Sequence, residues 1–318
     1  MSLITKEIKG RRYYYSFLSY RLTKGPKSFS KYVGVRKPSN HELKKIEDEF
    51  KNELIQRLSG RNYSNLLATK DEVIKSLLFS TEFNKKYNKL TKLRQLKYDI
   101  DSTVMFTLTT LVTEDVDVDL TDVKNAFNKT SGLTFREQIS KNMLRAVESI
   151  RHHHRLDSNY LLDLHRTIMA TFETKTPGKF RKKQVYLYQR GSSSQFEGRE
   201  IAYRPPQYNK IVKLLEQFFH RYDQSTLNPV EKAAVAHCDL YRIHPFLDGN
   251  KRICRLVFNK TLLDNHFPLI NISANKEAYF NVLVNSVETG NPKPFIEFTF
   301  KQYYLQVRGF LNNTAVNQ

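Results

Sequence analysis

A stretch of fifteen residues, Tyr241 to Arg255, constrains the fold of this chain more than any other part of the sequence, and reads YRIHPFLDGNKRICR. Upstream, the capping sequence NPVE at 228–231 predicts the start of a helix, and Pro245 ends it. Downstream, an apolar pattern of helical period resumes and predicts a second helix beginning near Asn250. The residues 244–249 are therefore expected to form a short loop between two helices.

The predicted loop brings together side chains that suit phosphate chemistry. His244 is a candidate general base near neutral pH, and Asp248 is a candidate oxygen ligand for a hard cation. Gly249 lets the backbone approach a ligand closely, and the helix N-terminus that follows suits an anion. Arg252 and Arg255 lie on one face of that helix, where forked guanidinium groups can bind phosphate oxygens. Together these residues predict transfer of a group from a metal-bound nucleotide to a hydroxyl whose proton the histidine removes.

The same stretch resembles the signature of a known family. The run HPFLDGNKRICR at 244–255 is similar to the Fic signature, HPFx(D/E)GN(G/K)RxxR, with every defining position filled. Shorter elements extend the resemblance over the last two thirds of the chain, and these are LH at 164–165, PGKFR at 177–181, YRPP at 203–206 and AAVAH at 233–237. The resemblance implies a mainly helical Fic-type bundle with a β-hairpin flap, which moves AMP from ATP to a protein hydroxyl with Mg2+.

The resemblance also implies a role for each residue of the site. His244 would be the base and Asp248 the metal ligand. The implied contacts to the nucleotide are Gly249, Asn250, Lys251, Arg252, Arg255, Tyr279 and Phe280. Tyr279 and Phe280 resemble a pair of aromatic residues that line the adenine pocket in the family, and flat rings suit a purine face. Packing in the core is the alternative role for both.

Lys251 leaves the type of reaction open. Most AMP-transferring members of the family have glycine at this position, whereas lysine resembles the Doc-like branch, which transfers a phosphoryl group. Pro245 and Gly249 are closer to the AMP-transferring form, because the Doc version lacks both. We therefore predict a protein adenylyltransferase, with a Doc-like protein kinase as the alternative. A non-catalytic nucleic-acid-binding adaptor is a third hypothesis.

An inhibitory element of the family is expected to be missing. Many Fic proteins carry a helix with the pattern (S/T)xxxE(G/N), whose glutamate pairs with the second arginine of the motif. The segment STVMFT at 102–107 aligns with this pattern and places Phe106 at the glutamate position. Phenylalanine cannot pair with Arg255, so the prediction is an enzyme without this internal brake. Glu114 is the nearest substitute.

Residues 180–203 are expected to form the flap. Short alternating segments flank a polar stretch at 191–195, a pattern that predicts a β-hairpin. In the family this hairpin holds a segment of the target as an added strand, so a target protein is expected to dock there. A merely structural hairpin is the alternative.

Residues 1–36 differ in character from the rest of the chain. A β-prone run from Tyr13 to Leu22, a KGPK turn at 24–27 and a second β-prone run predict a small antiparallel β element. Its interleaved aromatic and basic residues suit nucleic acid, although tyrosines on a half-buried sheet are more often packing residues. A helical N-terminal region at 37–130 and a Fic core domain at 131–318 complete the predicted organisation.

Composition narrows the class of protein. The 318 residues carry a net charge of +20, which favours acidic partners such as nucleic acid, but the basic residues are spread over nearly every segment, as on a solvated charged surface. With a mean hydropathy of -0.56, no apolar window of about 20 residues and no secretory signal, a cytoplasmic protein without a membrane span is expected. Two cysteines provide neither a disulfide framework nor a zinc site. Neither the target nor the oligomeric state follows from the sequence.

Overall fold

A computed structural model describes residues 2–152, 154–188, 201–272 and 275–313. The chain opens with three antiparallel strands, β1 (Ser2–Ile8), β2 (Arg11–Leu22) and β3 (Gly25–Gly34), in the order β1-β2-β3. The central strand β2 pairs with β1 through residues 11–17 and with β3 through residues 14–22. The predicted N-terminal β element is confirmed.

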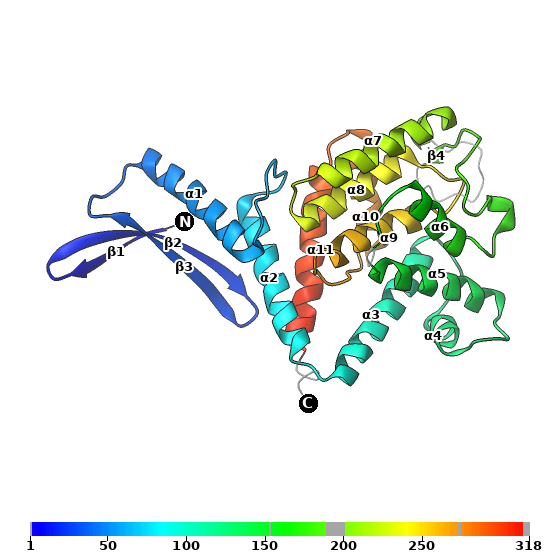
Figure 1. Ribbon diagram of the computed structural model, residues 1–318, viewed down its shortest axis with the longest axis horizontal. Coiled ribbons are helices and arrows are strands. Elements are labelled where there is room, and N and C mark those ends of the chain that lie inside the picture. Colours follow the sequence, from blue (N-terminus) through cyan, green and yellow to red (C-terminus); the bar gives the residue numbers. More distant parts are fainter. Residues whose placement is uncertain (1, 153, 189–200, 273–274, 314–318) are drawn as a thin grey trace.

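One face of this sheet packs against the first two helices, α1 (Asn40–Ser59) and α2 (Lys70–Asn88). Leu18, Tyr20 and Leu22 alternate along β2 and are buried, because every second side chain of a strand points to the same face. The Tyr20 hydroxyl also donates a hydrogen bond of 2.8 Å to Asp71 at the start of α2. Figure 1 shows the sheet at one end of the molecule, with α1 and α2 between it and the other helices.

The helices that follow begin at well-formed caps. Ser39, Thr69 and Thr134 each accept a hydrogen bond from the glutamate backbone three residues later, at the starts of α1, α2 and α5 (Phe135–Arg151). Between them lie α3 (Lys92–Thr113) and α4 (Leu120–Asn128). Figure 1 shows α3 running alongside the main bundle towards α5, so its C-terminal end lies near the centre of the molecule.

The main bundle consists of six further helices. Their bounds are α6 (Ser158–Ile168), α7 (Ile211–Gln224), α8 (Pro229–Ile243), α9 (Asn250–Leu263), α10 (Lys276–Glu288) and α11 (Lys293–Asn312), with single 3-10 turns at Glu173–Lys175 and Tyr208–Lys210. Helix α9 is at the centre, and nearly all of its side chains are buried. A helix that is buried all round is held by its neighbours on every side. The N-terminal end of α9 is therefore a fixed platform.

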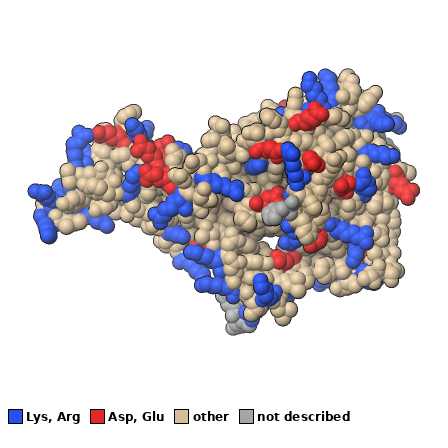
Figure 2. Space-filling model, in the orientation of Figure 1, with Lys and Arg blue, Asp and Glu red and all other residues tan. Residues whose placement is uncertain are grey.

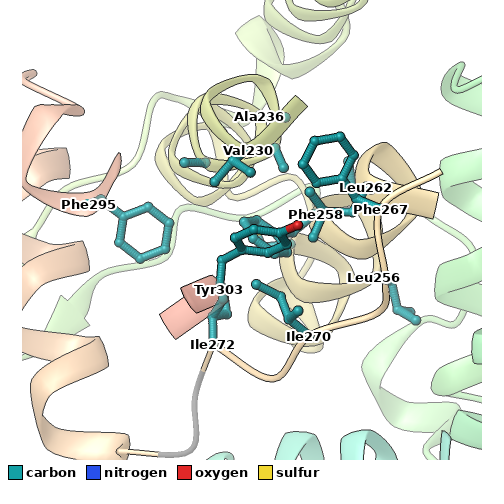
Figure 3. Close-up of a cluster of buried hydrophobic side chains, with 14 of the residues drawn as sticks. Val230, Ala236, Leu256, Phe258, Leu262, Phe267, Ile270, Ile272, Phe295 and Tyr303 are labelled. Carbon is teal, nitrogen blue, oxygen red and sulfur yellow. The ribbon is translucent and has the colours of Figure 1, made fainter. Parts of the chain in front are cut away.

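Figure 3 shows how the core holds α9 in place. Leu256, Phe258 and Leu262 from α9 pack among Val230 and Ala236 from α8 and Phe295 and Tyr303 from α11. Burying one such side chain contributes about 1.5 to 3 kcal/mol. The mainly helical fold class predicted from the sequence is confirmed.

The segment predicted as the flap contains two short paired strands. β4 (Leu187–Tyr188) and β5 (Ile201–Tyr203) are antiparallel, with Leu187 opposite Tyr203. The predicted polar tip at 191–195 lies outside the described residues. In the described ranges, no helix combines the length and the apolar composition that crossing a bilayer requires.

Candidate active site

The loop at 244–249 forms where α8 ends. His244 has φ of 50° and ψ of 60°, a left-handed conformation that closes the helix, and its N–H donates to the Leu240 carbonyl at 2.9 Å. Pro245 follows and cannot continue the helix. The chain then turns back into α9, and Figure 1 shows the two helices packed side by side. The helix, loop and helix predicted from the sequence are therefore present.

The side chain of Asn250 stabilises the loop through two hydrogen bonds to the backbone of Phe246. Its Oδ1 accepts a hydrogen bond from the Phe246 N–H, and its Nδ2 donates to the Phe246 carbonyl, both at 2.9 Å. The side chain is buried and fully used by these two bonds. A contribution of Asn250 to an anion hole would therefore have to come from its backbone N–H at the start of α9.

Gly249 is required for two independent reasons. Its φ of 76° is left-handed, which side chains with a Cβ rarely adopt. A Cβ at this position would also lie 3.0 Å from the Met169 sulfur and 3.4 Å from the ring of His165. Any other residue would push the loop away from α6 and displace the start of α9.

His165 packs against the loop, and its side chain is buried and therefore not accessible to a ligand. Its ring stacks on Phe246 with centroids 3.7 Å apart. Nδ1 accepts a hydrogen bond from the Gly178 N–H at 2.9 Å, so Nε2 carries the proton and donates to the Asp248 carbonyl at 3.1 Å. The LH and PGKFR elements of the sequence thus meet the central loop through this one imidazole.

His244 is placed as a neutral base. Its Nδ1 lies 3.3 Å from the Tyr241 carbonyl, so this nitrogen carries the proton and leaves the lone pair on Nε2. Burial lowers the pKa of His244 to about 4, and the positive charges of Lys251 and Arg181 add to the effect. The imidazole is therefore neutral at pH 7, as a proton acceptor must be.

Arg181 fixes the backbone that carries His244. Its guanidinium Nε donates to the His244 carbonyl at 2.8 Å, and its own N–H donates to the Pro245 carbonyl at 2.9 Å. A second guanidinium nitrogen donates to the Pro206 carbonyl at 2.5 Å. Because the side chain is almost fully buried, these contacts join the PGKFR and YRPP elements to the loop. Sequence analysis identified Arg181 as part of the resemblance but gave it no role.

The buried histidines predict a pH dependence of stability. Burial lowers the pKa of His165 to about 4, as it does for His244, and it lowers the pKa of the fully buried His237 well below 6.5. The unfolded chain binds more protons than the folded chain below pH 6.5, so the free energy of unfolding falls as pH falls towards 4. We expect a slope of up to about 1.4 kcal/mol per pH unit for each of these histidines.

Denaturant unfolding at pH 5 to 6.5 measures this slope. We expect His165→Gln to reduce the slope of the unfolding free energy against pH by up to about 1.4 kcal/mol per pH unit, because one histidine fewer takes up a proton on unfolding. His220→Gln, which changes an exposed histidine of α7, serves as the matched control and should leave the slope as it is in the wild type. Equal slopes for all three proteins would contradict the proposed protonation of His165.

Arg252 and Asp248 form a pair at the start of α9. Arg252 is buried, and its Nη2 lies 3.4 Å from Asp248 Oδ1, which also accepts the Gly249 N–H at 2.6 Å. Nε and Nη1 of Arg252 are buried and have no hydrogen-bond partner in the described part of the chain. The Asp248 side chain is 44% exposed, and no described residue donates to its Oδ2. The site thus presents unused guanidinium donors and a carboxylate oxygen.

Arg255 is bound by a glutamate from the N-terminal part of the chain. Its Nη2 donates to Glu114 Oε1 at 2.8 Å and to the Thr110 carbonyl at 3.1 Å. Lys251 takes the second carboxylate oxygen, with its Nζ 3.1 Å from Glu114 Oε2. Burial alone would raise the pKa of Glu114, but the attraction of Arg255 and Lys251 outweighs it and lowers the pKa to about 2. The carboxylate is therefore charged and neutralised by two cations of the motif.

This contact corrects the expectation that Arg255 has no glutamate partner from the inhibitory pattern. Phe106 lies two turns before the end of α3, is 1% exposed and lines a cavity with Pro268 and other residues away from Arg255. Glu114 is the first residue after α3 and is the one that pairs with Arg255. The expectation was wrong because the pattern was aligned eight residues, a little over two helical turns, too early in the sequence.

A sequence signal for the correct register was present. Thr110 and Glu114 have the (S/T)xxxE spacing, but Asp115 follows where the pattern has Gly or Asn. Asp115 has φ of 59°, a left-handed conformation that Gly, Asn and Asp adopt most readily. The left-handed backbone therefore explains why the pattern has Gly or Asn at this position and why Asp115 can replace them. The replacement made the pattern harder to find in the sequence.

The two aromatic residues predicted at the adenine pocket contact two side chains of the motif, Arg255 and Lys251. Tyr279 is fully buried, and its hydroxyl is 2.9 Å from His237 Nε2 and 3.4 Å from Arg255 Nη1. Phe280 is 8% exposed, and Lys251 Nζ sits 4.5 Å from the centre of its ring. Tyr279 thus positions Arg255. This role is closer to packing in the core, the alternative given for this residue, than to a contact with adenine. A contact of either ring with a nucleotide stays a prediction.

Residues 155–262 match the model of the Fic/DOC family. The chain contains a Fic/DOC family domain. The matched range includes His165, Arg181 and the whole motif at 244–255, whereas Glu114 and Tyr279 lie outside it. The contact between Glu114 and Arg255 therefore joins the Fic/DOC domain to a part of the chain that the family model does not cover.

Curated relatives that match part of this chain are named protein adenylyltransferases. Protein adenylyltransferase Fic of Drosophila erecta is 31% identical over 138 residues, which are 43% of this chain and 26% of the relative. Protein adenylyltransferase fic-1 of Caenorhabditis elegans is 24% identical over 161 residues, 51% of this chain and 30% of the relative. The chain thus spans less than a third of the length of these relatives.

Solved Fic structures share the fold. A fragment of C. elegans Fic-1, residues 134 to 508, superposes with a TM-score of 0.60 at 16% identity, covering 89% of this chain and 80% of that one. A Fic family protein from Desulfovibrio desulfuricans superposes with a TM-score of 0.62 at 18% identity, covering 76% of this chain and 75% of that one. At these identities the likeness shows the fold alone.

Proposed function

We propose that the protein is an adenylyltransferase that transfers AMP from ATP to a hydroxyl side chain of a target protein. The observation that carries the proposal is the placement of a neutral imidazole, His244, beside a helix N-terminus that holds buried guanidinium donors without partners. The names of the curated relatives agree with this reaction. The division into a β element at 1–36, a helical region at 37–130 and a core domain at 131–318 belongs to the proposal, as does a cytoplasmic location.

The residues at the start of α9 fit a bound triphosphate. Nε and Nη1 of Arg252 and Nε of Arg255 are buried without a hydrogen-bond partner among the described residues. An unsatisfied buried donor costs about 1 to 3 kcal/mol, more when it is charged, so an anion at these nitrogens would be strongly favoured. The backbone N–H groups that open α9 are further donors for an anion. ATP is a ligand that matches this set.

Asp248 fits the role of the Mg2+ ligand. Its Oδ2 is available, and no group of three or more His, Cys, Asp or Glu side chains in the described part of the chain could hold a metal alone. This agrees with Mg2+, which proteins commonly bind through one or two carboxylates together with substrate phosphates. When bound, the ion would neutralise charge on the phosphates.

The proposed reaction assigns one proton transfer to the protein. Nε2 of His244 accepts the proton of the target hydroxyl while the hydroxyl oxygen forms a bond to the α-phosphorus. The bond between the α-phosphorus and the bridging oxygen to the β-phosphate breaks, and pyrophosphate leaves. Arg252 holds the phosphates, and Arg181 keeps the His244 backbone in place.

The target is proposed to dock on the hairpin of β4 and β5. A segment that pairs with a strand edge is held by backbone hydrogen bonds, which place a hydroxyl with little dependence on sequence. Tyr203 on β5 anchors this hairpin to the site, because its hydroxyl donates to the Arg242 carbonyl at 3.1 Å, two residues before His244.

Phosphoryl transfer is the second candidate, and Lys251 is the observation that favours it. Lys251 follows Asn250 in the first turn of α9, where its ammonium group could shift which phosphate lies beside His244. In this chain, however, the ammonium group binds Glu114 Oε2 and lies over the Phe280 ring, so it has a role that does not require a phosphate.

ATP labelled separately on the α and γ phosphates distinguishes the two reactions. We expect α label and not γ label on protein, with release of pyrophosphate instead of ADP, both for the wild type and for Lys251→Gly. Lys213→Gly, which removes a lysine exposed on α7, controls for the loss of charge. Transfer of γ label with release of ADP would replace the proposed function by the kinase reaction.

A further inference from the structure

The inner and outer faces of the N-terminal sheet differ in how their charges are balanced. In an antiparallel sheet, residues opposite each other lie on the same face, so the register assigns each side chain. On the inner face, Lys31 pairs with Glu53 of α1 at 2.5 Å and Lys27 with Glu82 of α2 at 3.7 Å. These lysines are balanced by acids and serve to dock the sheet on α1 and α2.

The outer face is basic and aromatic. Its side chains on β1 and β2 include Lys6, Arg11, Tyr13, Tyr15, Phe17, Ser19 and Arg21, and those on β3 include Ser28, Ser30 and Tyr32. Residues 2–37 hold ten Lys or Arg and a single acid, Glu7, which the register places opposite Arg12 on the inner face. Arg11 and Arg21 are exposed and form no ion pair with any residue that the structure describes. The outer face therefore has no acid to neutralise it.

Further cations border this face. Lys9 lies at the turn between β1 and β2, Lys24 lies at the turn between β2 and β3, and Arg36 and Lys37 follow β3. Figure 1 shows the turn between β1 and β2 at the free end of the sheet, and Figure 2 shows Lys and Arg gathered at that end. In the same view, acidic side chains gather where α1 lies. The positive charge therefore increases away from the helices.

The tyrosine rings of the outer face pack mainly on one another. Tyr32 lies 5.5 Å from Tyr15 and 6.1 Å from Tyr13, between ring centroids, and Lys6 Nζ lies 4.8 Å from the centre of Tyr15. The rings are tilted against one another and do not form a row of separate platforms for unpaired bases, although Tyr32 is 52% exposed. The hydroxyl groups of these tyrosines and of the nearby serines are suited instead to phosphates and base edges.

We propose that the outer face of the β1 to β3 sheet binds double-stranded DNA. Three strands about 4.8 Å apart make a surface about 10 Å across, which matches the major groove of B-DNA, about 12 Å wide. Sheets do read DNA in this way, with basic side chains on the phosphates. Figure 1 shows α1 and α2 between the sheet and the bundle that contains α8 and α9, so bound DNA would leave His244 accessible to a protein target.

The proposal is tested by measuring how tightly the full chain binds a labelled duplex of about 20 base pairs. Fluorescence anisotropy reports the binding over a range of salt concentrations. For Arg11→Ala combined with Arg21→Ala we expect an affinity about tenfold lower at moderate salt, and a slope of log K against log salt that is smaller by about two. An unchanged midpoint of thermal unfolding shows that the sheet remains folded.

A second double variant removes the same charge elsewhere. Lys213→Ala with Lys301→Ala changes exposed lysines of α7 and α11, and its affinity should stay within about twofold of the wild type. If both double variants weakened DNA binding equally, the effect would be one of overall charge, and the proposal would be overturned. Tighter binding to the single strand of the same length, or no binding to either, would overturn it as well. Each of these outcomes is independent of AMP transfer.

Discussion

Replacing His244 by asparagine is expected to lower AMP transfer by a factor of about 100 to 10,000, the usual range for a general base. Asparagine is preferable to alanine here because residue 244 has φ of 50°, which asparagine adopts more readily. The Arg181 contacts reach the backbone carbonyls of residues 244 and 245 and do not depend on the imidazole. The variant should therefore keep the loop, and with it ATP binding, while losing only the proton acceptor.

Single-turnover transfer of α label and calorimetric titration with ATP separate these two effects. The expected result is a lower rate of transfer at an unchanged affinity for ATP. His220→Asn, an exposed position on α7, is the matched control and should change neither quantity. Transfer at the wild-type rate by the His244 variant would show that the hydroxyl proton leaves by another route, and the base assignment would fail.

The local parts of the site could be predicted because their signals are local. The NPVE cap, Pro245 and the apolar period of α9 specify where two helices stop and start, and Gly249 marks a turn that excludes a Cβ. These choices depend on backbone conformation within a few residues. The same holds for β2 and β3 of the N-terminal sheet, whose β-prone runs were visible in the sequence, whereas β1 was not predicted.

The long-range contacts of the site could not be predicted in the same way. Arg255 and Glu114 are 141 residues apart, and no local pattern states which acid of the segment 114–122 reaches the motif. The choice depends on the left-handed turn at Asp115, which stops α3 at the level of α9. Nor did the sequence show that the side chain of Asn250 closes the loop through two hydrogen bonds to Phe246.

Replacing Glu114 by alanine is expected to raise AMP transfer by about 10 to 100-fold, the range of a coupling energy of 1 to 3 kcal/mol. In the resting protein both oxygens of this carboxylate are held, one by Arg255 and one by Lys251. A triphosphate must compete with a charge that already occupies these cations. Without Glu114, both cations become available to ATP.

The same substitution should destabilise the protein in the absence of ATP. Arg255 is fully buried, and removing the partner of a buried charge costs about 3 to 5 kcal/mol. We therefore expect Glu114→Ala to unfold at a lower temperature than the wild type and to gain more from added Mg-ATP, because the phosphates replace the lost carboxylate. A merely structural role for Glu114 would lower stability without raising transfer.

Two further variants show which property of Glu114 restrains the enzyme. Glu114→Gln keeps a hydrogen-bond acceptor for Arg255 but loses the charge, so its rate should lie between those of the wild type and Glu114→Ala. Asp115→Asn weakens the neighbouring ion pair with Lys276 and tolerates the left-handed φ, so Glu114 should stay bound and the rate should stay low. If Asp115→Asn activated the enzyme as strongly as Glu114→Ala, the restraint would lie in the position of α3 and not in the occupation of Arg255.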